Sequence, residues 1–597
     1  MAFKKLKIAP GIIKDSTPSE LEGHWSDSNL IRFQSGLPRT VGGWLQISGS
    51  TYTGVCRSLR AFSDNSGSSY IAVGTHTNLY IYNGGNYYDI TPIRATTTPA
   101  PTPFATVLNS ATVTITDTTH GALVGDTVII SEASAVNGIT LLGNYIVQTV
   151  PTSNTYTVTG PNIANNTGSG GGTPTIKYLL NIGLVNPAIS TGWGTGVWSG
   201  AFGWDTPSAG STTLALPRIW FMDNFGQTLL IAPRGGTLYK WDPTVDGTSG
   251  RATAVAGSPA IIEAGVIVNP QNRHVVCLGA SYNTTPAPTQ IIWSDQMDYT
   301  VWTPTATNLA GSLQGGGVSR IFGGQLGNNQ IVAIGDTRIY GLNYIGSPYV
   351  FGLAPMDTVA SLIATNAIAS FNGMIAWMGT TNFYIYNGSQ VLPIPCPVKD
   401  YVYTDLNTLY KDKIFAFANS AYNEIWWFYP SAASMGEPDK YVSYNTVEQV
   451  WAVGTLSRTA ATSKSIFDFP ILANPADSIL YYHENGTTAN GALIQASITS
   501  GPIDLQDGDT FATINRFIPD LQLTGGADLT ITTRSFPNDV GTVNGPYAIL
   551  PATQQLLPRV RGRSIQFQIT STDVGNPEKT SWRMGDLVVS YVPSGRR

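Results

Sequence analysis

The apolar residues of this chain occur in short runs and show little helical periodicity. The runs are four to six residues long, are rich in Val, Ile, Thr, Tyr and Trp, and end at Gly, Asn, Pro or Asp. β-Branched and aromatic residues favour strands, and the residues that end the runs favour turns. We therefore predict an all-β chain.

One unit of this pattern recurs, in which a β-rich run, a turn, a short strand with Tyr or Trp and a second turn follow one another. Met374–Gly379, for example, is followed by Phe383–Tyr386 and then by Asn387-Gly388. From Leu238 onward the second strands start 39 to 58 residues apart, which brackets the blade spacing of about 40 to 50 residues in propellers. We predict a β-propeller of about six or seven blades, with an irregular array of β-sandwiches as the alternative.

Composition divides the chain further. No Lys or Arg lies between Arg94 and Lys177, and this stretch has linker-like borders at 96–101 and 168–172. Alternating strands lie between the borders, so we predict a small β domain inserted in a loop. The blade pattern ends near Gly491, and the alternating strands after it indicate a β-sandwich-like domain. The predicted domains are an extended N-terminal segment that packs on the ring and propeller (1–60), the propeller (61–94 and 177–490), the insert (95–176) and the C-terminal domain (491–597).

Charged residues are few. They make up 12% of the 597 residues, against about 25% in average domains. The 32 Lys and Arg against 37 Asp and Glu leave a net charge of −5, which argues against a surface that coats nucleic acid. A surface with so little charge is weakly soluble as a free monomer. We therefore expect other subunits to cover much of it.

Residues that could catalyse a reaction or bind a metal are sparse. Cys56, Cys277 and Cys396 are far apart, and we predict buried reduced thiols. The 5 His are well separated, without a paired zinc motif, and the sequence has no serine elbow. We predict no cofactor, no metal and no catalytic residue. No run of 18 apolar residues spans a membrane and no signal peptide is evident, so we expect assembly in a cytosol.

One segment supports an alternative function. Trp293–Trp302 contains Asp295 and Asp298 and weakly resembles the Asp-box turns of sialidase propellers, but it lacks their glycine and occurs once. A glycosidase needs two carboxylates facing each other across a sugar-binding cleft, about 5–10 Å apart. A structural turn with a hydrogen-bonded Asp is the simpler interpretation. The alternative is a carbohydrate-binding or glycosidase-type propeller, such as a receptor-binding tail protein.

The N-terminal stretch carries the most specific motifs. They are Ala9-Pro10-Gly11-Ile12, Gly23-His24-Trp25-Ser26-Asp27-Ser28-Asn29, Ile31-Arg32-Phe33, Gly36-Leu37-Pro38 and Gly42-Gly43-Trp44. Further similar segments lie at 73–92, 372–398 and 561–586. Together they resemble the tail nozzle family of short-tailed bacteriophages, also called packaged-DNA stabilisation or tail tubular proteins. The resemblance spans nearly the whole chain except residues 95–176.

The resemblance implies a non-enzymatic structural protein of the virion tail, assembled in the host cytoplasm. Such proteins form a ring below the portal adaptor, line the DNA exit channel, retain the genome and attach fibres or spikes. The implied partners are further copies of the chain in a hexameric ring, the portal adaptor protein, tail fibre or spike proteins, and genomic DNA that passes without specific binding. A neutral or mildly acidic channel would let DNA slide, whereas cations would bind it.

Cations gather near the C-terminus. Arg559, Arg561 and Arg563 lie in one short run. A solvated face is the usual meaning of such a cluster, and a strip of salt bridges between subunits is the alternative. We name these three arginines as candidate inter-subunit contacts.

Overall fold

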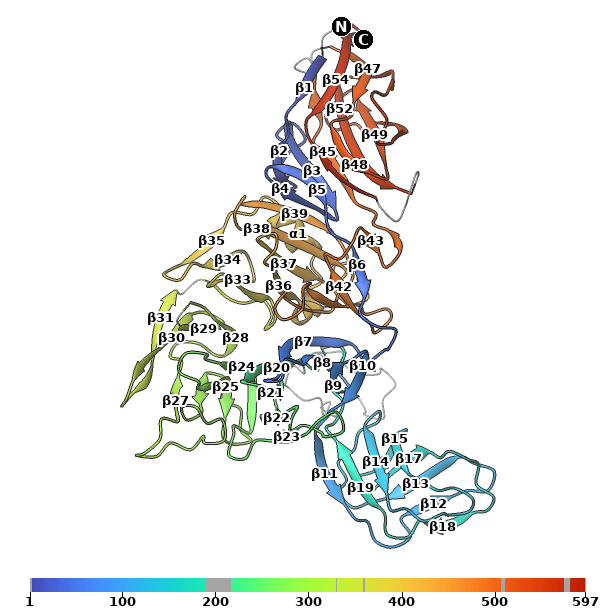
Figure 1. Cartoon of the computed structure of the whole chain (residues 1–597), viewed down its shortest axis with the longest axis vertical. Helices are drawn as coiled ribbons and strands as arrows, with labels where there is room; N and C mark the ends of the chain where they lie inside the picture. The colour runs from blue at the N-terminus through green and yellow to red at the C-terminus, as the bar shows by residue number, and fades with distance from the viewer. Residues whose placement is uncertain are drawn as a thin grey trace, which may run out of the picture. The chain divides into compact units, whose positions relative to one another are not determined.

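Strands make up nearly all of the regular structure. The computed structural model describes residues 3–187, 216–328, 330–357, 360–505, 510–573 and 580–595. In this part of the chain, the helical elements are one α-helix, α1 (Lys399–Asp405), and one 3₁₀-helix, η1 (Thr408–Lys413). The predicted all-β class is confirmed (Figure 1). The chain divides into two compact units, one formed by Met1–Gly49, Pro288–Gln290 and Leu313–Arg597 and the other by Ser50–Ala287 and Ile291–Ser312.

Blade-like sheets follow one another along the chain. In each, four consecutive strands lie side by side in chain order and pair antiparallel, which is the arrangement of a propeller blade. In the second unit these sheets are β7 (Cys56–Ser63), β8 (Ser69–Thr75), β9 (Leu79–Asn83) and β10 (Asn86–Asp89); β20 (Trp220–Phe225), β21 (Thr228–Pro233), β22 (Tyr239–Trp241) and β23 (Thr253–Ala254); and β24 (Ile261–Val268), β25 (Val275–Ser281), β26 (Gln290–Trp293) and β27 (Gly311–Gln314). The strand β27 ends in the first unit. The fold is therefore of the propeller type that the recurring pattern predicts.

The first unit continues the series with three more blades. They are β28 (Ile321–Leu326), β29 (Gln330–Gly335), β30 (Ile339–Gly346) and β31 (Val350–Asp357); β32 (Ile368–Phe371), β33 (Met374–Met378), β34 (Phe383–Tyr386) and β35 (Val391–Ile394); and β36 (Phe415–Asn419), β37 (Glu424–Tyr429), β38 (Lys440–Asn445) and β39 (Val450–Thr455). Every residue of β37 is buried. Strands buried on both faces read as continuous apolar runs, as Ile425–Tyr429 does.

The last sheet of the series takes a strand from the N-terminal segment. It consists of β40 (Ala460–Thr462), β41 (Ile471–Ala473), β42 (Leu480–His483), β6 (Trp44–Gln46), β43 (Thr488–Ala489) and β44 (Ala492–Leu493). Tyr482 of β42 pairs with Leu45 of β6. The strands β40–β44 alone do not complete this sheet, because β6 lies between β42 and β43.

The C-terminal sheets also contain N-terminal strands. One sheet has β1 (Phe3–Leu6), β54 (Leu587–Pro593), β47 (Ala512–Ile518) and β51 (Val560–Gly562); a second has β2 (Ala9–Ile12), β3 (His24–Asn29), β45 (Ser497–Ser500), β46 (Ile503–Asp504), β52 (Ser564–Thr572), β49 (Gly526–Arg534) and β50 (Thr542–Ile549); a third has β4 (Ile31–Gln34), β5 (Leu37–Thr40), β53 (Ser581–Met584) and β48 (Leu521–Thr524). The predicted boundaries at 60 and 491 therefore differ from the structure. The strands between Phe3 and Thr40 belong to the C-terminal sheets, and β7 already begins at Cys56.

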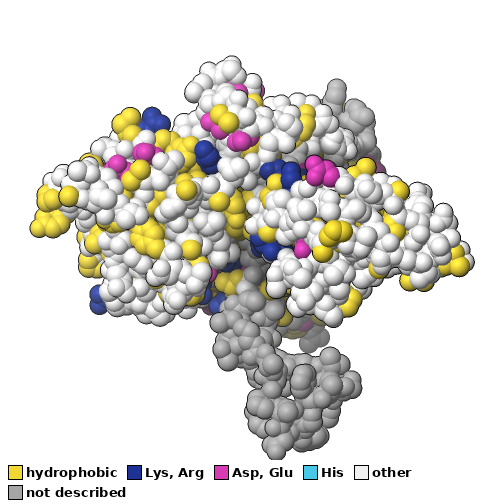
Figure 2. Space-filling view, turned by 90° about the horizontal axis from the view of Figure 1, so that it is seen from below, with side chains coloured by type: hydrophobic (Ala, Val, Ile, Leu, Met, Phe, Trp, Pro, Cys, Tyr) yellow, Lys and Arg dark blue, Asp and Glu magenta, His cyan; other side chains and the backbone are white. Residues whose placement is uncertain are grey.

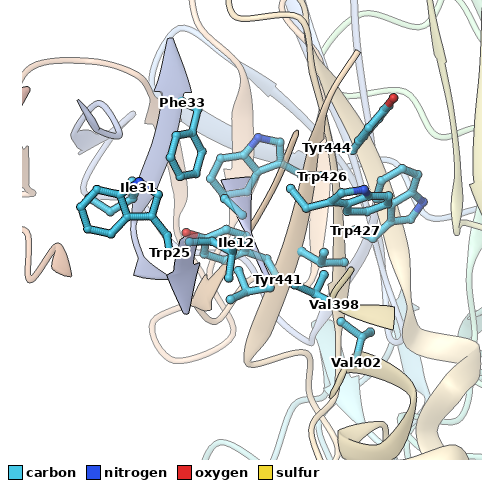
Figure 3. Close-up of a cluster of buried hydrophobic side chains, with 14 of the residues drawn as sticks. Ile12, Trp25, Ile31, Phe33, Val398, Val402, Trp426, Trp427, Tyr441 and Tyr444 are labelled. Atoms are coloured by element: carbon cyan, nitrogen blue, oxygen red, sulfur yellow. The ribbon is translucent and has the colours of Figure 1, made fainter. Parts of the chain in front are cut away.

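A single apolar core joins these N-terminal strands to the blades of the first unit. Ile12, Trp25 and Ile31 lie in one cluster with Trp426 and Tyr441 of the blade β36–β39, and Figure 3 shows these side chains facing one another. The Leu30 N–H donates a hydrogen bond to the Tyr441 hydroxyl at 2.9 Å. The C-terminal sheets are thus continuous with the blades and are not a separate body.

The insert has a core of its own. Its two sheets are β11 (Ile93–Thr97), β19 (Thr175–Leu179), β14 (Thr127–Ser131) and β15 (Gly143–Ile146), and β16 (Thr149–Thr152), β17 (Thr155–Thr159), β13 (Thr112–Thr116), β12 (Phe104–Thr106) and β18 (Gly168–Gly170). Phe104, Tyr156 and Tyr178 are fully buried between them. The predicted linkers are partly strands. β11 runs to Thr97, and Gly168–Gly170 pairs with β12, because an edge strand needs only backbone groups to pair.

Candidate interaction surfaces

Two of the three predicted arginines share one aromatic ring. Arg561 of β51 and Arg563, two residues later, have guanidinium carbons 4.2 Å and 5.0 Å from the centre of the Phe511 ring. Arg563 lies at the bend between β51 and β52 (Ser564–Thr572), and both guanidinium groups reach the same ring. Arg561 Nη2 also donates to the Ser594 carbonyl at 3.1 Å. Both arginines therefore hold the C-terminal sheets together, and any contact between subunits comes in addition.

Arg559 differs from the other two. It lies just before β51 with a φ of 53°, and its side chain is exposed. Arg561 is exposed as well, so what distinguishes Arg559 is that it lies outside the shared contact with Phe511. Whether the three arginines contact another subunit stays a prediction.

A hairpin with an apolar tip extends from the blade β28–β31. The pairing of β29 with β30 ends at Gln330 and Asn343, whereas the pairing of β30 with β31 continues to Gly346 and Val350. Beyond Asn343 the hairpin is therefore only two strands wide, and Figure 1 shows it reaching past the other strands of its sheet. Tyr344, Ile345 and Tyr349 at this tip are 40%, 57% and 76% exposed. Two-stranded hairpins are marginally stable in water, so an exposed apolar tip favours a protein partner.

The surface of the insert is nearly uncharged. Within 95–176, all of which the structure describes, Glu132 is exposed, while Asp117, His120 and Asp126 are buried. Asp117 Oδ2 accepts hydrogen bonds from Thr97 Oγ1 at 2.5 Å and from the Tyr178 hydroxyl at 2.7 Å. More than half of each of several aliphatic side chains is exposed, namely Val107, Leu108, Leu123, Val124, Leu142, Ile146 and Ile163. Figure 2 shows a face of the molecule on which charged side chains are few and scattered.

A buried ion cluster ties the N-terminal segment to two blades. Arg32 of β4 is 2% exposed, and its Nε donates to Glu424 of β37 at 3.1 Å. Its Nη1 donates to Glu484, just after β42, at 2.8 Å. The Tyr422 ring lies 3.6 Å from the guanidinium carbon. This cluster was not predicted from the sequence, where its signal is a charged residue between the apolar residues Ile31 and Phe33.

The cluster carries one more acid than base. Burial raises the pKa of the Glu424 carboxyl above its usual value, although the charge of Arg32 acts in the opposite direction. Burial also disfavours the charge on Arg32, but the attraction of Glu424 and Glu484 outweighs it and raises the pKa of the guanidinium. Trp426 Nε1 donates to Glu424 at 2.9 Å, and the Gly42 N–H donates to Glu484 at 3.0 Å. Charge removed from one member leaves its partner buried without compensation.

The three cysteines are free thiols; Cys56 and Cys277 are buried as predicted, whereas Cys396 is only partly buried. Burial raises the pKa of the Cys56 and Cys396 thiols to about 12 and raises that of Cys277 as well, so the thiolate form is disfavoured.

In the part of the chain that is described, no group of three or more His, Cys, Asp or Glu is placed to hold a metal ion. Among the described helices none is long and apolar enough to cross a membrane.

The segment with the Asp-box resemblance forms hydrogen-bonded turns. Asp295 Oδ1 accepts from the Gln296 and Leu309 N–H groups at 2.8 Å and 2.7 Å. Asp298 Oδ1 accepts from the Thr300 N–H and hydroxyl at 2.7 Å and 2.6 Å. Both carboxylates therefore have turn-forming partners.

A small amide-lined pocket lies on the blades of the first unit. It has a volume of about 280 Å³ and is lined by Asn328, Gln330, Asn343, Tyr386 and Gly388. Gln330 Nε2 donates to the Tyr386 hydroxyl. Amides bind neutral hydroxyl groups, but Tyr386 is 1% exposed and offers no ring face for a sugar to stack on.

Comparisons with known proteins add little. No protein-family model matches the sequence, and no curated protein matches it. The solved structures that resemble it include the WD40 domain of Neurospora crassa Pan2, which is 5% identical with a TM-score of 0.34 and covers 74% of this chain and 96% of its own. The CNH domain of AfRom2 is 10% identical with a TM-score of 0.27, over 47% of this chain and 93% of its own.

A third structure is a fungal alcohol oxidase of the AA5 family in complex with copper. It is 10% identical with a TM-score of 0.30, and the match covers 85% of this chain and 100% of the oxidase. All three TM-scores are below 0.5, so these likenesses carry no inference about what the chain does.

Proposed function

We propose that this chain is a structural subunit of a ring in the tail of a short-tailed bacteriophage, of the nozzle type that its N-terminal motifs resemble. In this role it would line the DNA exit channel below the portal adaptor, retain the genome and carry fibres or spikes. The proposal includes no catalytic step. The observation that carries it is the hairpin tip of Tyr344, Ile345 and Tyr349, which exposes apolar side chains beyond the edge of its sheet.

The sparse charge of the chain supports the same proposal. Large exposed apolar patches on soluble proteins mark interaction sites, and permanent interfaces are more apolar than transient ones. The hairpin tip exposes three apolar side chains, and the nearly uncharged insert exposes several aliphatic ones. Closed rings of identical subunits use one surface against a different surface of the next copy, so a protruding hairpin suits a ring.

Assembly of the purified protein tests the proposal. We expect wild-type protein, alone at high concentration or mixed with a portal–adaptor complex, to form closed rings with a central pore in negative-stain images. The triple variant Tyr344→Ser, Ile345→Ser, Tyr349→Ser is expected to raise the concentration needed for assembly at least about tenfold, because it removes roughly 1.4 kcal/mol or more of apolar burial. Mass photometry measures the shift.

A matched control separates the tip from general surface apolarity. The variant Met435→Ser, Val447→Ser changes residues that are 100% and 69% exposed in the same unit, and we expect it to assemble like wild type. The proposal is contradicted if the wild-type protein stays monomeric at high concentration and does not bind the portal–adaptor complex. The variant Arg559→Glu adds a test of the predicted arginine strip, because Arg559 is exposed and lies outside the contact that Arg561 and Arg563 make with Phe511.

Binding of a neutral sugar is the second candidate function, and the amide-lined pocket is the observation that favours it. It predicts that sugar binding, measured on a glycan array, is lost on Asn343→Ala while ring assembly is unchanged. The nozzle proposal predicts that this variant changes neither.

A further inference from the structure

A second pocket lies at one end of the C-terminal sheets, where β49 and β52 meet the loop before β3. It has a volume of about 310 Å³, within the usual range of ligand pockets. Its walls come from three separate segments of the chain. They are the loop residues Ser16, Pro18 and Leu21, the residue Pro502 after β45, and Arg534, Pro537, Asn538, Asp539 and Gln566 around the end of β49.

Arg534 is the cation of this pocket, and it has no carboxylate partner among the described residues. Its Nε donates to the Asp539 carbonyl at 3.1 Å, and its Nη2 donates to Gln566 Oε1 at 2.9 Å. Its Nη1 is buried and makes no hydrogen bond. A guanidinium has five N–H donors, and buried donors are almost always satisfied. The unused donors therefore mark a place for an acceptor that the chain itself does not supply.

The guanidinium is held in place by its neighbours. Gln566 Nε2 donates to the Ser500 carbonyl at 2.8 Å, which fixes the amide so that its oxygen faces Arg534. The Arg534 carbonyl accepts from the Arg563 N–H at 3.0 Å. A side chain oriented by such contacts loses little freedom when it binds a ligand.

The acidic side chains nearby have other partners. Asp539 Oδ2 accepts from the Ser535 and Phe536 N–H groups at 3.2 Å and 2.9 Å and so closes the turn between β49 and β50. Glu20 Oε2 accepts from the Ser16 hydroxyl at 2.7 Å. These carboxylates leave the charge of Arg534 without a direct ion pair.

We infer that this pocket binds a carboxylate carried by an extended peptide of a partner protein. Arginine pairs with a carboxylate through two parallel hydrogen bonds. Pro18, Pro502, Pro537 and Leu21 supply apolar walls for the adjoining peptide side chains. The pocket contains no aromatic residue, so a sugar carboxylate would lack a ring to stack on. The site lies within one copy of the chain and does not depend on ring formation.

Matched peptides test the inference on the full-length protein. The probes are the acetylated, amidated tripeptide proline–leucine–glutamate, its glutamine counterpart, and free glucuronate as the sugar carboxylate. Saturation-transfer NMR with titration measures each affinity. We expect the glutamate peptide to bind at least about tenfold more tightly than the glutamine peptide, because hydrogen bonds to a charged group contribute about 1.5–3 kcal/mol.

Three variants locate the binding. Arg534→Met is expected to abolish the preference for glutamate over glutamine, and Arg534→Lys to restore only part of it, because lysine lacks the planar fork. Arg559→Met, which removes an exposed arginine outside the pocket, is expected to bind like wild type. Circular dichroism checks that each variant folds, and if Arg534→Met does not fold, the glutamate and glutamine peptides on wild type still decide.

The outcomes that overturn the inference are specific. Equal affinity for the two peptides, absence of binding by either peptide, or an unchanged preference in Arg534→Met each refutes it. Tighter, Arg534-dependent binding of glucuronate assigns the pocket to acidic sugars and refutes the peptide. Because ring assembly is measured separately by mass photometry, failure here is distinguishable from failure of the proposed function.

Discussion

The insert and the C-terminal sheets are both built from antiparallel strands, but their strands come from different places in the chain. Every strand of the insert lies between Ile93 and Leu179, and its ends pair with each other. Each C-terminal sheet, in contrast, includes strands from residues 3–40. The insert can therefore form from one continuous stretch, whereas the C-terminal sheets need both ends of the chain.

The two regions also place their charges differently. Within 95–176 the insert buries Asp117 and Asp126 and exposes Glu132. The first unit buries Arg32 with Glu424 and Glu484, which come from separate segments. A region whose strands are contiguous in sequence, such as the insert, can be altered without destabilising the rest of the protein. A region built from distant segments depends for its stability on a few long-range contacts. Three changes test this difference, in order of expected effect.

Loss of Arg32 is expected to have the largest effect. Arg32→Met leaves Glu424 and Glu484 buried without their cation, and breaking a buried pair in this way costs about 3–5 kcal/mol. Hydrogen–deuterium exchange measured by mass spectrometry should show faster exchange in peptides of β3, β4 and β37, with the insert unchanged.

Arg39→Met is the matched control. Arg39 lies in the adjoining strand β5 and is exposed, so we expect an effect below about 0.5 kcal/mol. Equal effects of the two changes would contradict the view that the buried cluster joins the segments.

The pH dependence of the same cluster is expected to be smaller. The folded-state pKa of Glu424 lies above its unfolded value of about 4.5, so the folded protein binds this proton more tightly. Its contribution to stability therefore increases as pH falls from neutral and is lost as pH rises through the folded-state pKa. The change is at most about 1.4 kcal/mol per pH unit.

Glu424→Gln removes that titration. Exchange rates of the β37 peptides, corrected for intrinsic pH dependence, should slow as pH falls from neutral in wild type relative to the variant. The opposite sign would mean that the ion pair with Arg32 outweighs burial in setting the pKa of Glu424.

Deletion of the insert is expected to have the smallest effect on the rest of the chain. Ile93 and Leu179 are paired neighbours, so a two-residue turn can replace residues 94–178. We expect a change in melting temperature of the remaining protein below about 2 °C, measured by differential scanning calorimetry. Global unfolding would show that the insert supports the blades.

Local patterns predicted the blades well. The predicted run at 374–379 forms β33 (Met374–Met378) and Phe383–Tyr386 forms its partner β34, because their apolar runs and the turn between them depend on neighbouring residues. The distant pairings could not be predicted in this way. Trp25 lies in a recognisable strand, but nothing in its own sequence indicates that it pairs with Ser500.

The candidate surfaces were predicted less completely. Proximity in sequence identified Arg561 and Arg563 as a pair, but their shared contact depends on Phe511, which lies just before β47 and some 50 residues earlier. Gly168–Gly170 has the composition of a linker, yet β12 lies beside it and turns it into an edge strand. The role of Arg32 could not be predicted from the sequence, because its carboxylate partners come from elsewhere in the chain.

The pairing of N-terminal strands with C-terminal strands has a consequence for folding during translation. Ser26 donates its hydroxyl hydrogen bond to the carbonyl of Ser500, 474 residues later. At a translation rate of about 5–20 residues per second, the first strands leave the ribosome roughly half a minute to a minute and a half before their partners exist. During that interval Trp25 and Ile31 have no sheet to join, and a nascent chain in this state is a natural client for chaperones.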